Sequence, residues 1–115
     1  MTIKIYHNPR CSKSRQALTL LEEKGISPEI IEYLNTPLNE GEIKALATLL
    51  GVENDPRAMM RVKEDDYKAN NLKEADDAAL FKAMATFPKL IERPIIVNGK
   101  KATIGRPPEN ALDVI

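Results

Sequence analysis

Aromatic residues are scarce in this chain of 115 residues, since tryptophan is absent and Phe and Tyr together make up 4%. The core must therefore consist mostly of Leu, Ile, Val, Ala and Met. An excess of charge is also missing, because 17 basic residues balance 17 acidic ones. Broad binding to nucleic acid or to an anionic membrane needs a net basic face, so this balance argues against both.

Long apolar runs are missing as well, and no stretch is long enough to span a bilayer. The N-terminus, "MTIKIYHNP", lacks the basic region, apolar segment and small-residue cleavage site of a signal peptide. We therefore expect a cytoplasmic protein whose thiol stays reduced. The length suits one domain with a core of its own.

The chain has one cysteine, Cys11, and one histidine, His7. A single cysteine excludes an intrachain disulfide and a cysteine-based zinc site. A lone cysteine is more often a small buried hydrophobe than a nucleophile. Both residues lie within "YHNPRCSKSR", between an apolar segment and a helical one, and this position favours a reactive thiol.

The N-terminal part of the chain has the pattern of a βαβ unit. "IKIY" at Ile3–Tyr6 and "EIIEY" at Glu29–Tyr33 predict strands, and the apolar face of residues 12–24 predicts a helix between them. A crossover of this kind makes the two strands parallel.

The middle of the chain predicts helices. Asn39 and Glu42 form a capping-box pattern at the start of one helix. Asp55 is placed to cap a short helix predicted over Pro56–Arg61, and a further helix is predicted over residues 77–86.

The C-terminal part predicts a β-hairpin, from "PIIV", "NG" and "KKATI", and a short final helix started by the prolines of "GRPPENALDVI". This order of elements predicts an α/β, thioredoxin-like (glutaredoxin-type) fold with a mixed four-stranded sheet. We assign residues 1–37 and 92–115 to the thioredoxin-like core and residues 38–91 to a helical insertion within a single domain.

The predicted helix places Cys11 at its N-terminal edge, where first-turn N–H groups and the helix dipole favour negative charge. The cations Arg10, Lys13 and Arg15 add positive potential. Such surroundings lower the pKa of a cysteine from ~8.5 to roughly 3.5–7.5, so we expect a thiolate at neutral pH.

Two polar side chains near Cys11 are candidates to assist it. His7 follows the first strand and could orient the thiolate or support it electrostatically, although a cap or a surface group is the commoner role for such a histidine. Ser14 could donate its hydroxyl to the sulfur or to a bound oxygen.

Arg57 and Arg61, in "RAMMR", are predicted one helical turn apart on the same face. Arg57 follows Glu53 by four residues, which predicts a surface ion pair between them. Arg61 is predicted to be the freer of the two, with Asp65 as a nearby carboxylate.

Arg93 and Arg106 each precede a proline, in "ERPIIV" and "IGRPP". In a thioredoxin-like layout the loop before the third strand abuts the cysteine loop, which points Arg93 at the thiol. A guanidinium suits oxygen-rich anions because it makes bidentate, charge-assisted hydrogen bonds. A solvated charge is the commoner role for any single arginine. The peptide bond before Pro94 is a candidate for cis geometry.

Together, "YHNPRCSKSR", "RAMMR", "LIERPIIV" and "IGRPP" resemble the glutaredoxin-coupled arsenate reductase family in order and spacing, over nearly the whole chain. The chain resembles the short members, which lack the C-terminal extension of the plasmid-type reductases. The resemblance implies a thioredoxin-like fold with a helical insertion. It also implies that Cys11 is the nucleophile, that His7 supports its low pKa and that Ser14 stands beside the thiol. The residues between Cys11 and Ser14 differ from those of the plasmid-type enzymes.

The resemblance further implies that Arg61, Arg93 and Arg106 bind the oxyanion and that Pro94 is the family's cis-proline. The implied substrate is arsenate, with no bound cofactor and no metal. Reduction to arsenite needs two electrons, which one thiolate cannot supply, and the family takes the extra thiols from glutathione and then glutaredoxin.

Three alternatives bear on this interpretation. A low-molecular-weight phosphatase needs an arginine six residues after its cysteine, and Ala17 stands there, which excludes it. A regulator that binds RNA polymerase shares the fold but senses redox through a Cys-x-x-Cys pair, and Ser14 removes that switch while leaving a switchless regulator open. A general glutathione-dependent thiol oxidoreductase is also compatible with the sequence.

Overall fold

The computed structural model describes residues 3–115, which divide into two compact units. The sheet unit comprises the chain up to Thr36 together with Arg93–Ile115, and the helical unit comprises Pro37–Glu92. The sequence placed the limits of the insertion at residues 38 and 91.

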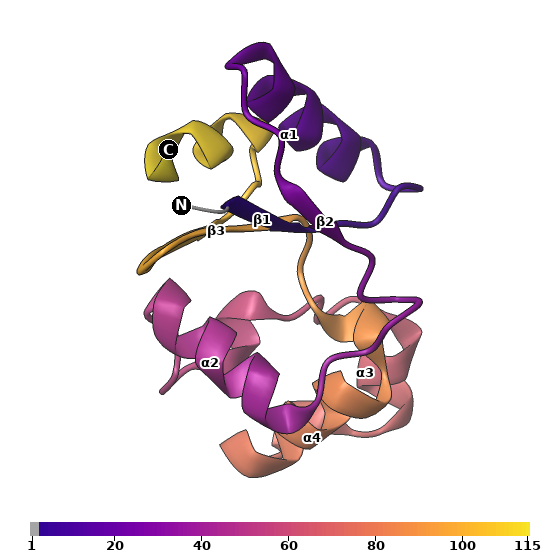
Figure 1. The fold of residues 1–115 in the computed structure, drawn as a ribbon. Coiled ribbons are helices and arrows are strands. Elements are labelled where there is room, and N and C mark those ends of the chain that lie inside the picture. The colour runs from indigo at the N-terminus through magenta and orange to yellow at the C-terminus, as the bar shows by residue number, and fades with distance from the viewer. Residues whose placement is uncertain (1–2) are drawn as a thin grey trace. The chain divides into compact units, whose positions relative to one another are not determined.

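The sheet unit is built on a mixed four-stranded sheet in the order β2-β1-β3-β4. Three of these strands, β1, β2 and β3, are labelled in Figure 1. The strands are β1 (Ile3–Tyr6), β2 (Glu29–Ile31), β3 (Ile95–Asn98) and β4 (Lys101–Ile104). β1 runs parallel to β2 and antiparallel to β3, which is antiparallel to β4. The predicted thioredoxin-like sheet, with its βαβ unit and its hairpin, is therefore confirmed.

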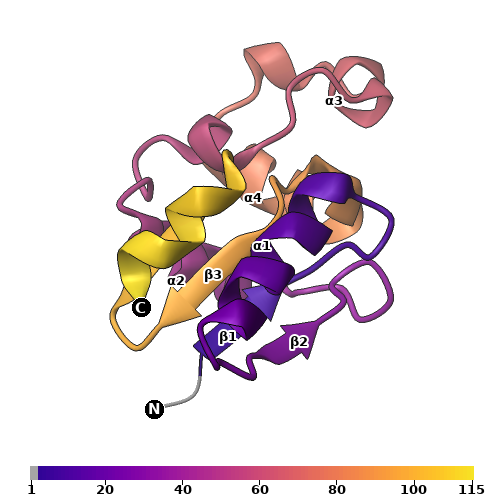
Figure 2. The same ribbon diagram turned by 90° about the horizontal axis from the view of Figure 1, so that it is seen from above.

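Two helical segments cover one face of this sheet, namely α1 (Ser12–Glu23) and the 3₁₀ helix η4 (Pro108–Val114). They lie side by side above the strands (Figure 2). Their apolar faces and the central strands form one buried cluster. Its fully buried members are Ile5, Ala17, Leu21, Ile96 and Ala111. This burial fixes the start of α1 relative to the ends of β1 and β3.

Strand β2 is shorter than the prediction of Glu29–Tyr33. Its partner β1 ends at Tyr6, opposite Ile31, because the chain turns there into the cysteine loop. Without a partner strand, the chain after Ile31 bends, and the N–H of Asn35 donates to the carbonyl of Glu32 at 2.9 Å.

The helical unit contains two longer helices, α2 (Glu40–Leu50) and α4 (Asp77–Thr86), which pack on each other. Asn39 and Glu42 form the predicted capping box, and Gly51 ends α2 with a left-handed φ of 75°. The shorter segments are η1 (Pro56–Met59), α3 (Asp65–Ala69), η2 (Leu72–Glu74) and η3 (Pro88–Leu90).

The predicted helix over Pro56–Arg61 is wrong in its extent. η1 is a 3₁₀ helix that ends at Met59, and Met60 is extended and forms a bridge with Ile91. Asp55 makes no capping hydrogen bond with its side chain. The two arginines of "RAMMR" therefore do not share a helix face, because the helix ends between them.

The surroundings of Arg57 also differ from the prediction. Its Nε donates to the hydroxyl of Tyr67 at 3.1 Å, and its Nη2 donates to the carbonyls of Leu72 and Ala75 at 2.7 and 2.8 Å. The expected ion pair with Glu53 does not form. Through these hydrogen bonds Arg57 links η1 to α3 and η2, so its role is structural.

No helix among residues 3–115 is long and apolar enough to cross a membrane.

Candidate active site

The strand register brings three loop segments to one end of the sheet. Tyr6, the last residue of β1, lies opposite Ile95, the first residue of β3, and Ile95 lies opposite Ile104, the last residue of β4. The loop after β1, the segment before β3 and the segment after β4 therefore leave the sheet together. They carry Cys11, Arg93 and Arg106.

The cysteine loop is held by its own backbone. The N–H of Cys11 donates to the carbonyl of Asn8 at 3.0 Å, and the N–H of Arg10 donates to the Asn8 side chain at the same distance. Asn8 in turn donates its N–H to the hydroxyl of Ser14 at 3.3 Å. These bonds set Cys11 as the extended N-cap residue of α1, with its side chain at the first turn.

Cys11 is 8% exposed, and burial by itself raises the pKa of its thiol. Four groups outweigh this effect and bring the pKa below the usual value of a cysteine. In decreasing order they are the backbone N–H of Ser14, the guanidinium of Arg93, the backbone N–H of Lys13 and the guanidinium of Arg106. The thiolate is thus favoured by first-turn N–H groups, as predicted. The positive charge comes from Arg93 and Arg106, whereas the sequence had named Arg10, Lys13 and Arg15 for this charge.

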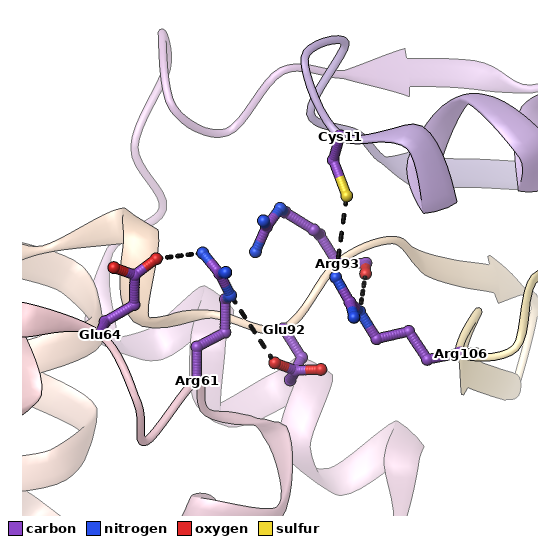
Figure 3. A network of polar contacts seen from close by, with 6 residues as sticks. All are labelled: Cys11, Arg61, Glu64, Glu92, Arg93 and Arg106. Atoms are coloured by element: carbon purple, nitrogen blue, oxygen red, sulfur yellow. Dashed lines mark hydrogen bonds and ion pairs between the residues drawn. The ribbon is translucent and has the colours of Figure 1, made fainter.

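Arg106 links the thiol to the segment before β3. Its Nη2 lies 3.7 Å from the Cys11 sulfur, and its Nε donates to the carbonyl of Arg93 at 2.9 Å (Figure 3). The N–H of Gly105 donates to the carbonyl of Pro94 at 2.8 Å. The Arg93–Pro94 bond is cis, as predicted, and so is the Arg106–Pro107 bond, which was not predicted.

Arg93 brings buried guanidinium donors to the site. Its Nε and Nη1 are buried, and no acceptor among the described residues pairs with them. A buried donor without a partner costs free energy, and more so when it is charged. An oxygen-rich anion beside the thiol would satisfy both atoms, because a guanidinium offers paired donors.

His7 is 5% exposed, and its backbone N–H donates to the carbonyl of Ile31 at 2.8 Å. Burial lowers the pKa of the imidazole and outweighs the opposing effect of Glu32, so the ring is neutral at pH 7. Its Nδ1 is buried and lacks a partner among the described residues. The two roles predicted for His7, orienting the thiolate and supporting its low pKa, stay predictions.

Ser14 is fully buried beneath the loop. Its hydroxyl oxygen accepts the bond from Asn8, and its backbone N–H is the group that favours the thiolate most. A hydroxyl bond from Ser14 to the sulfur or to a bound oxygen stays a prediction.

Arg61 belongs to the helical unit, where two carboxylates lie near its guanidinium. Its guanidinium pairs with Glu64, and its Nε lies 3.9 Å from a carboxylate oxygen of Glu92 (Figure 3). Asp65, the predicted neighbour, is not its partner in the structure. Binding of an oxyanion by Arg61 stays a prediction.

In a comparison with known protein families, the sequence model of the ArsC family matches residues 6–114. The chain belongs to the ArsC family. An arsenate reductase of Haemophilus influenzae is 50% identical over 117 residues, which cover 100% of both chains. A protein of Escherichia coli described as uncharacterized, YfgD, is also 50% identical, over 98% of this chain and 96% of its own.

The solved structure of an arsenate reductase from Vibrio cholerae is 53% identical and superimposes with a TM-score of 0.96. The match covers 100% of this chain and 98% of that one. The fold of this ArsC-family chain is therefore that of a known arsenate reductase.

Two residues of this ArsC-family site were missed by the sequence analysis. Asn8 has no signal beyond its place before Pro9 in a loop. Gly105 has one, because a glycine precedes the arginine in "IGRPP". A Cβ at Gly105 would lie 2.8 Å from Cγ of Pro94 and 3.1 Å from Cδ1 of Ile96, so only glycine lets the two Arg-Pro segments approach.

Residues 3–115 contain no group of three or more His, Cys, Asp and Glu side chains that could hold a metal ion.

The first prediction concerns the charge on the thiol. Replacing Arg93 by Gln removes the largest side-chain contribution to the low pKa of Cys11, so the pKa should rise. Arg106→Gln should raise it by less. The rate of alkylation by iodoacetamide against pH gives the pKa, and its midpoint should move to higher pH. Arg10→Gln is the matched control on the same loop, and an equal shift there would contradict the assignment.

The second prediction concerns the approach of the two Arg-Pro segments. Gly105→Ala should raise the pKa of Cys11, because Pro94 must move and both guanidinium groups move with it. Overpacking should also destabilise the protein by about 1–3 kcal/mol. Urea unfolding and the alkylation profile measure the two effects.

Gly41→Ala in α2 is the control for this substitution. Its Cβ would lie 3.3 Å from Oδ1 of Asn39, the acceptor of the capping bond, so alanine adds a comparable steric strain at a position in the helical unit. Gly41→Ala should therefore leave the pKa of Cys11 unchanged. An unchanged thiol pKa in Gly105→Ala would show that the glycine does not position the arginines.

Proposed function

We propose that the chain reduces arsenate to arsenite. The observation that carries this proposal is Arg93, whose buried Nε and Nη1 lack a partner beside a thiol of lowered pKa. Arsenate is a tetrahedral, doubly charged oxyanion whose oxygens match the donor pair of a guanidinium. Membership of the ArsC family and the names of the similar proteins support the same substrate.

In the first step the Cys11 thiolate attacks arsenic. One arsenic–oxygen bond breaks, and the departing oxygen takes up a proton and leaves as water. The product is a thiol–arsenic(V) adduct, in which no electrons have yet been transferred. Arg93 and Arg106 hold the remaining oxygens, and the N–H groups of Ser14 and Lys13 favour the sulfur anion before the attack.

The second step reduces arsenic(V) to arsenic(III). Two electrons are needed, and they come from oxidation of two thiols to one disulfide. Cys11 is the only cysteine of the chain, so the second thiol must come from outside. Glutathione supplies it, which releases arsenite and leaves glutathione in a mixed disulfide with Cys11. Glutaredoxin then reduces this disulfide, in the cytoplasm where thiols are kept reduced.

A general glutathione-dependent thiol oxidoreductase is the alternative, because the same lowered pKa suits thiol–disulfide exchange. A coupled assay with NADPH, glutathione reductase, glutathione and glutaredoxin separates the two functions. We expect turnover with arsenate to exceed turnover with a disulfide substrate such as hydroxyethyl disulfide. The reverse order would favour the alternative, since a neutral disulfide makes no use of Arg93.

The third prediction tests the single nucleophile. Cys11→Ser should abolish arsenate reduction while the fold remains intact, because no other thiol exists in the chain. The coupled assay measures the loss, and circular dichroism checks the fold. Turnover above a blank without enzyme would contradict the single-thiol mechanism, and turnover of wild type with neither glutathione nor glutaredoxin present would contradict the external thiol.

The fourth prediction separates the two arginines of the helical unit. Arg61→Ala should weaken arsenate use at least tenfold, since charge-assisted hydrogen bonds contribute about 1.5–3 kcal/mol each. Its free energy of unfolding should change by less than about 1 kcal/mol, because its ion pairs are partly exposed.

Arg57→Ala is the matched control, with the opposite expectation. It should lower the free energy of unfolding by about 2–3 kcal/mol, because three carbonyls and a tyrosine hydroxyl lose their donor. Activity per folded molecule should stay near that of wild type. Equal losses of arsenate use in both variants would show that Arg61 has no special role.

A further inference from the structure

A groove of about 420 Å³ lies on the outer side of the sheet unit, between α1 and the start of η4. Pockets for small molecules measure roughly 300–1,000 Å³, so this groove is in the lower part of that range. Its lining consists of Ser12, Arg15, Gln16, Thr19, Leu20, Pro108 and Glu109. Ser12 directly follows Cys11, so the groove starts at the residue next to the thiol.

The two sides of the groove carry opposite charges. Arg15, from α1, donates one Nη1 bond to the carbonyl of Pro9 at 3.0 Å and keeps its other guanidinium donors without a partner among the described residues. Glu109, from η4, has no hydrogen bond or ion pair to its carboxylate within residues 3–115. Leu20 and Pro108 give the groove an apolar part.

We propose that this groove binds the glutathione that supplies the second thiol. The proposal rests on the proposed function, which requires an external thiol to reach the adduct on Cys11. Glutathione carries two carboxylates and one ammonium group, so it matches a site with one cation and one anion. Arg15 pairs with a carboxylate and Glu109 with the ammonium group, and the hydroxyl and amide groups of the lining take the peptide bonds.

The dimensions agree with a ligand of three residues. An extended chain advances at most roughly 3.3–3.6 Å per residue, so glutathione spans about 10 Å. Helical residues rise about 1.5 Å each, so the lining from Ser12 to Leu20 runs about 12 Å along α1. The thiol of glutathione is on its central residue. A tripeptide with one end at Ser12 therefore brings this thiol to within about one residue length, roughly 3.5 Å, of the first turn of α1.

The binding test uses S-methylglutathione, which has the charges of glutathione but no free thiol. Added to ¹⁵N-labelled wild-type protein, it should shift the amide signals of the groove residues. Arg15→Gln and Glu109→Gln should each raise its Kd about two- to fivefold, the range of an exposed charge pair of ~0.4–1 kcal/mol. The double variant should raise it roughly tenfold.

Charge-matched controls lie on the same elements outside the groove. Lys24→Gln follows the end of α1 and Asp113→Asn lies in η4, and both should leave the Kd unchanged. Equal effects in the controls would mean that general charge, and not the groove, attracts the peptide. Shifts confined to other residues would overturn the assignment as well.

A kinetic test follows the same variants in the coupled assay. Glu109→Gln, which lies outside the cysteine loop, should raise the KM for glutathione by the same factor and leave the KM for arsenate unchanged. Failure of wild type to reduce arsenate with any thiol would overturn the proposed function, while S-methylglutathione binding would still decide the groove. An unchanged glutathione KM, with impaired reduction by glutaredoxin alone, would overturn the glutathione site in favour of a protein contact.

Discussion

A thiol removed from water becomes a thiolate only if nearby charges and dipoles replace the lost hydration. Cys11 meets this condition through two sources at once. The first turn of α1 provides backbone N–H groups, and the two arginines provide positive charge from segments remote in sequence. Neither source is far from the sulfur, and both depend on where the sheet ends. The chemistry of the site therefore depends on strand register as much as on residue type.

The strand register brings the arginines to the thiol through only short loop segments. β1 and β3 are antiparallel neighbours, so the end of one strand lies beside the beginning of the other. A shift of the register would separate Arg93 from the thiol while leaving the sheet intact. The second link, from Arg106 to the carbonyl of Arg93, adds the hairpin to the same site. Gly105 allows that link because nothing but hydrogen fits against Pro94.

Sequence patterns correctly predicted the elements that are stabilised by contacts between residues close in sequence. The capping box of Asn39 and Glu42 and the hairpin at "NG" both formed as expected, because their hydrogen bonds join residues close in sequence. The helix over Pro56–Arg61 failed for the opposite reason. Its spacing is helical, yet Met60 pairs with Ile91, some thirty residues away, and this contact draws the chain out of the helix.

In the candidate site, too, features set by local sequence were predicted and features set by long-range contacts were not. The first-turn position of Cys11 follows from the boundary between a strand and a helix, and it was predicted. The carboxylate of Glu92 near Arg61 could not be predicted, because the bridge of Met60 with Ile91 brings these two distant segments together. Glu64, the other partner, is only three residues away in sequence. The neutral state of His7 escaped prediction too. It comes from burial, which a lone histidine in a loop does not reveal.

In the proposed reaction, this chain supplies the positive charge that binds the oxyanion, and an external thiol completes the supply of electrons that reduce it. Within the sheet unit, this chain provides positive charge and backbone donors in abundance, but only one thiol. It can bind and polarise an oxyanion by itself, whereas it cannot complete a two-electron reduction. The arginines therefore determine which oxyanion binds. The groove between α1 and η4 determines which small thiol can act as the reductant. Under the proposed function, the arginines that bind the oxyanion and the groove residues that bind the thiol are different residues, so each set can change in sequence without altering the other.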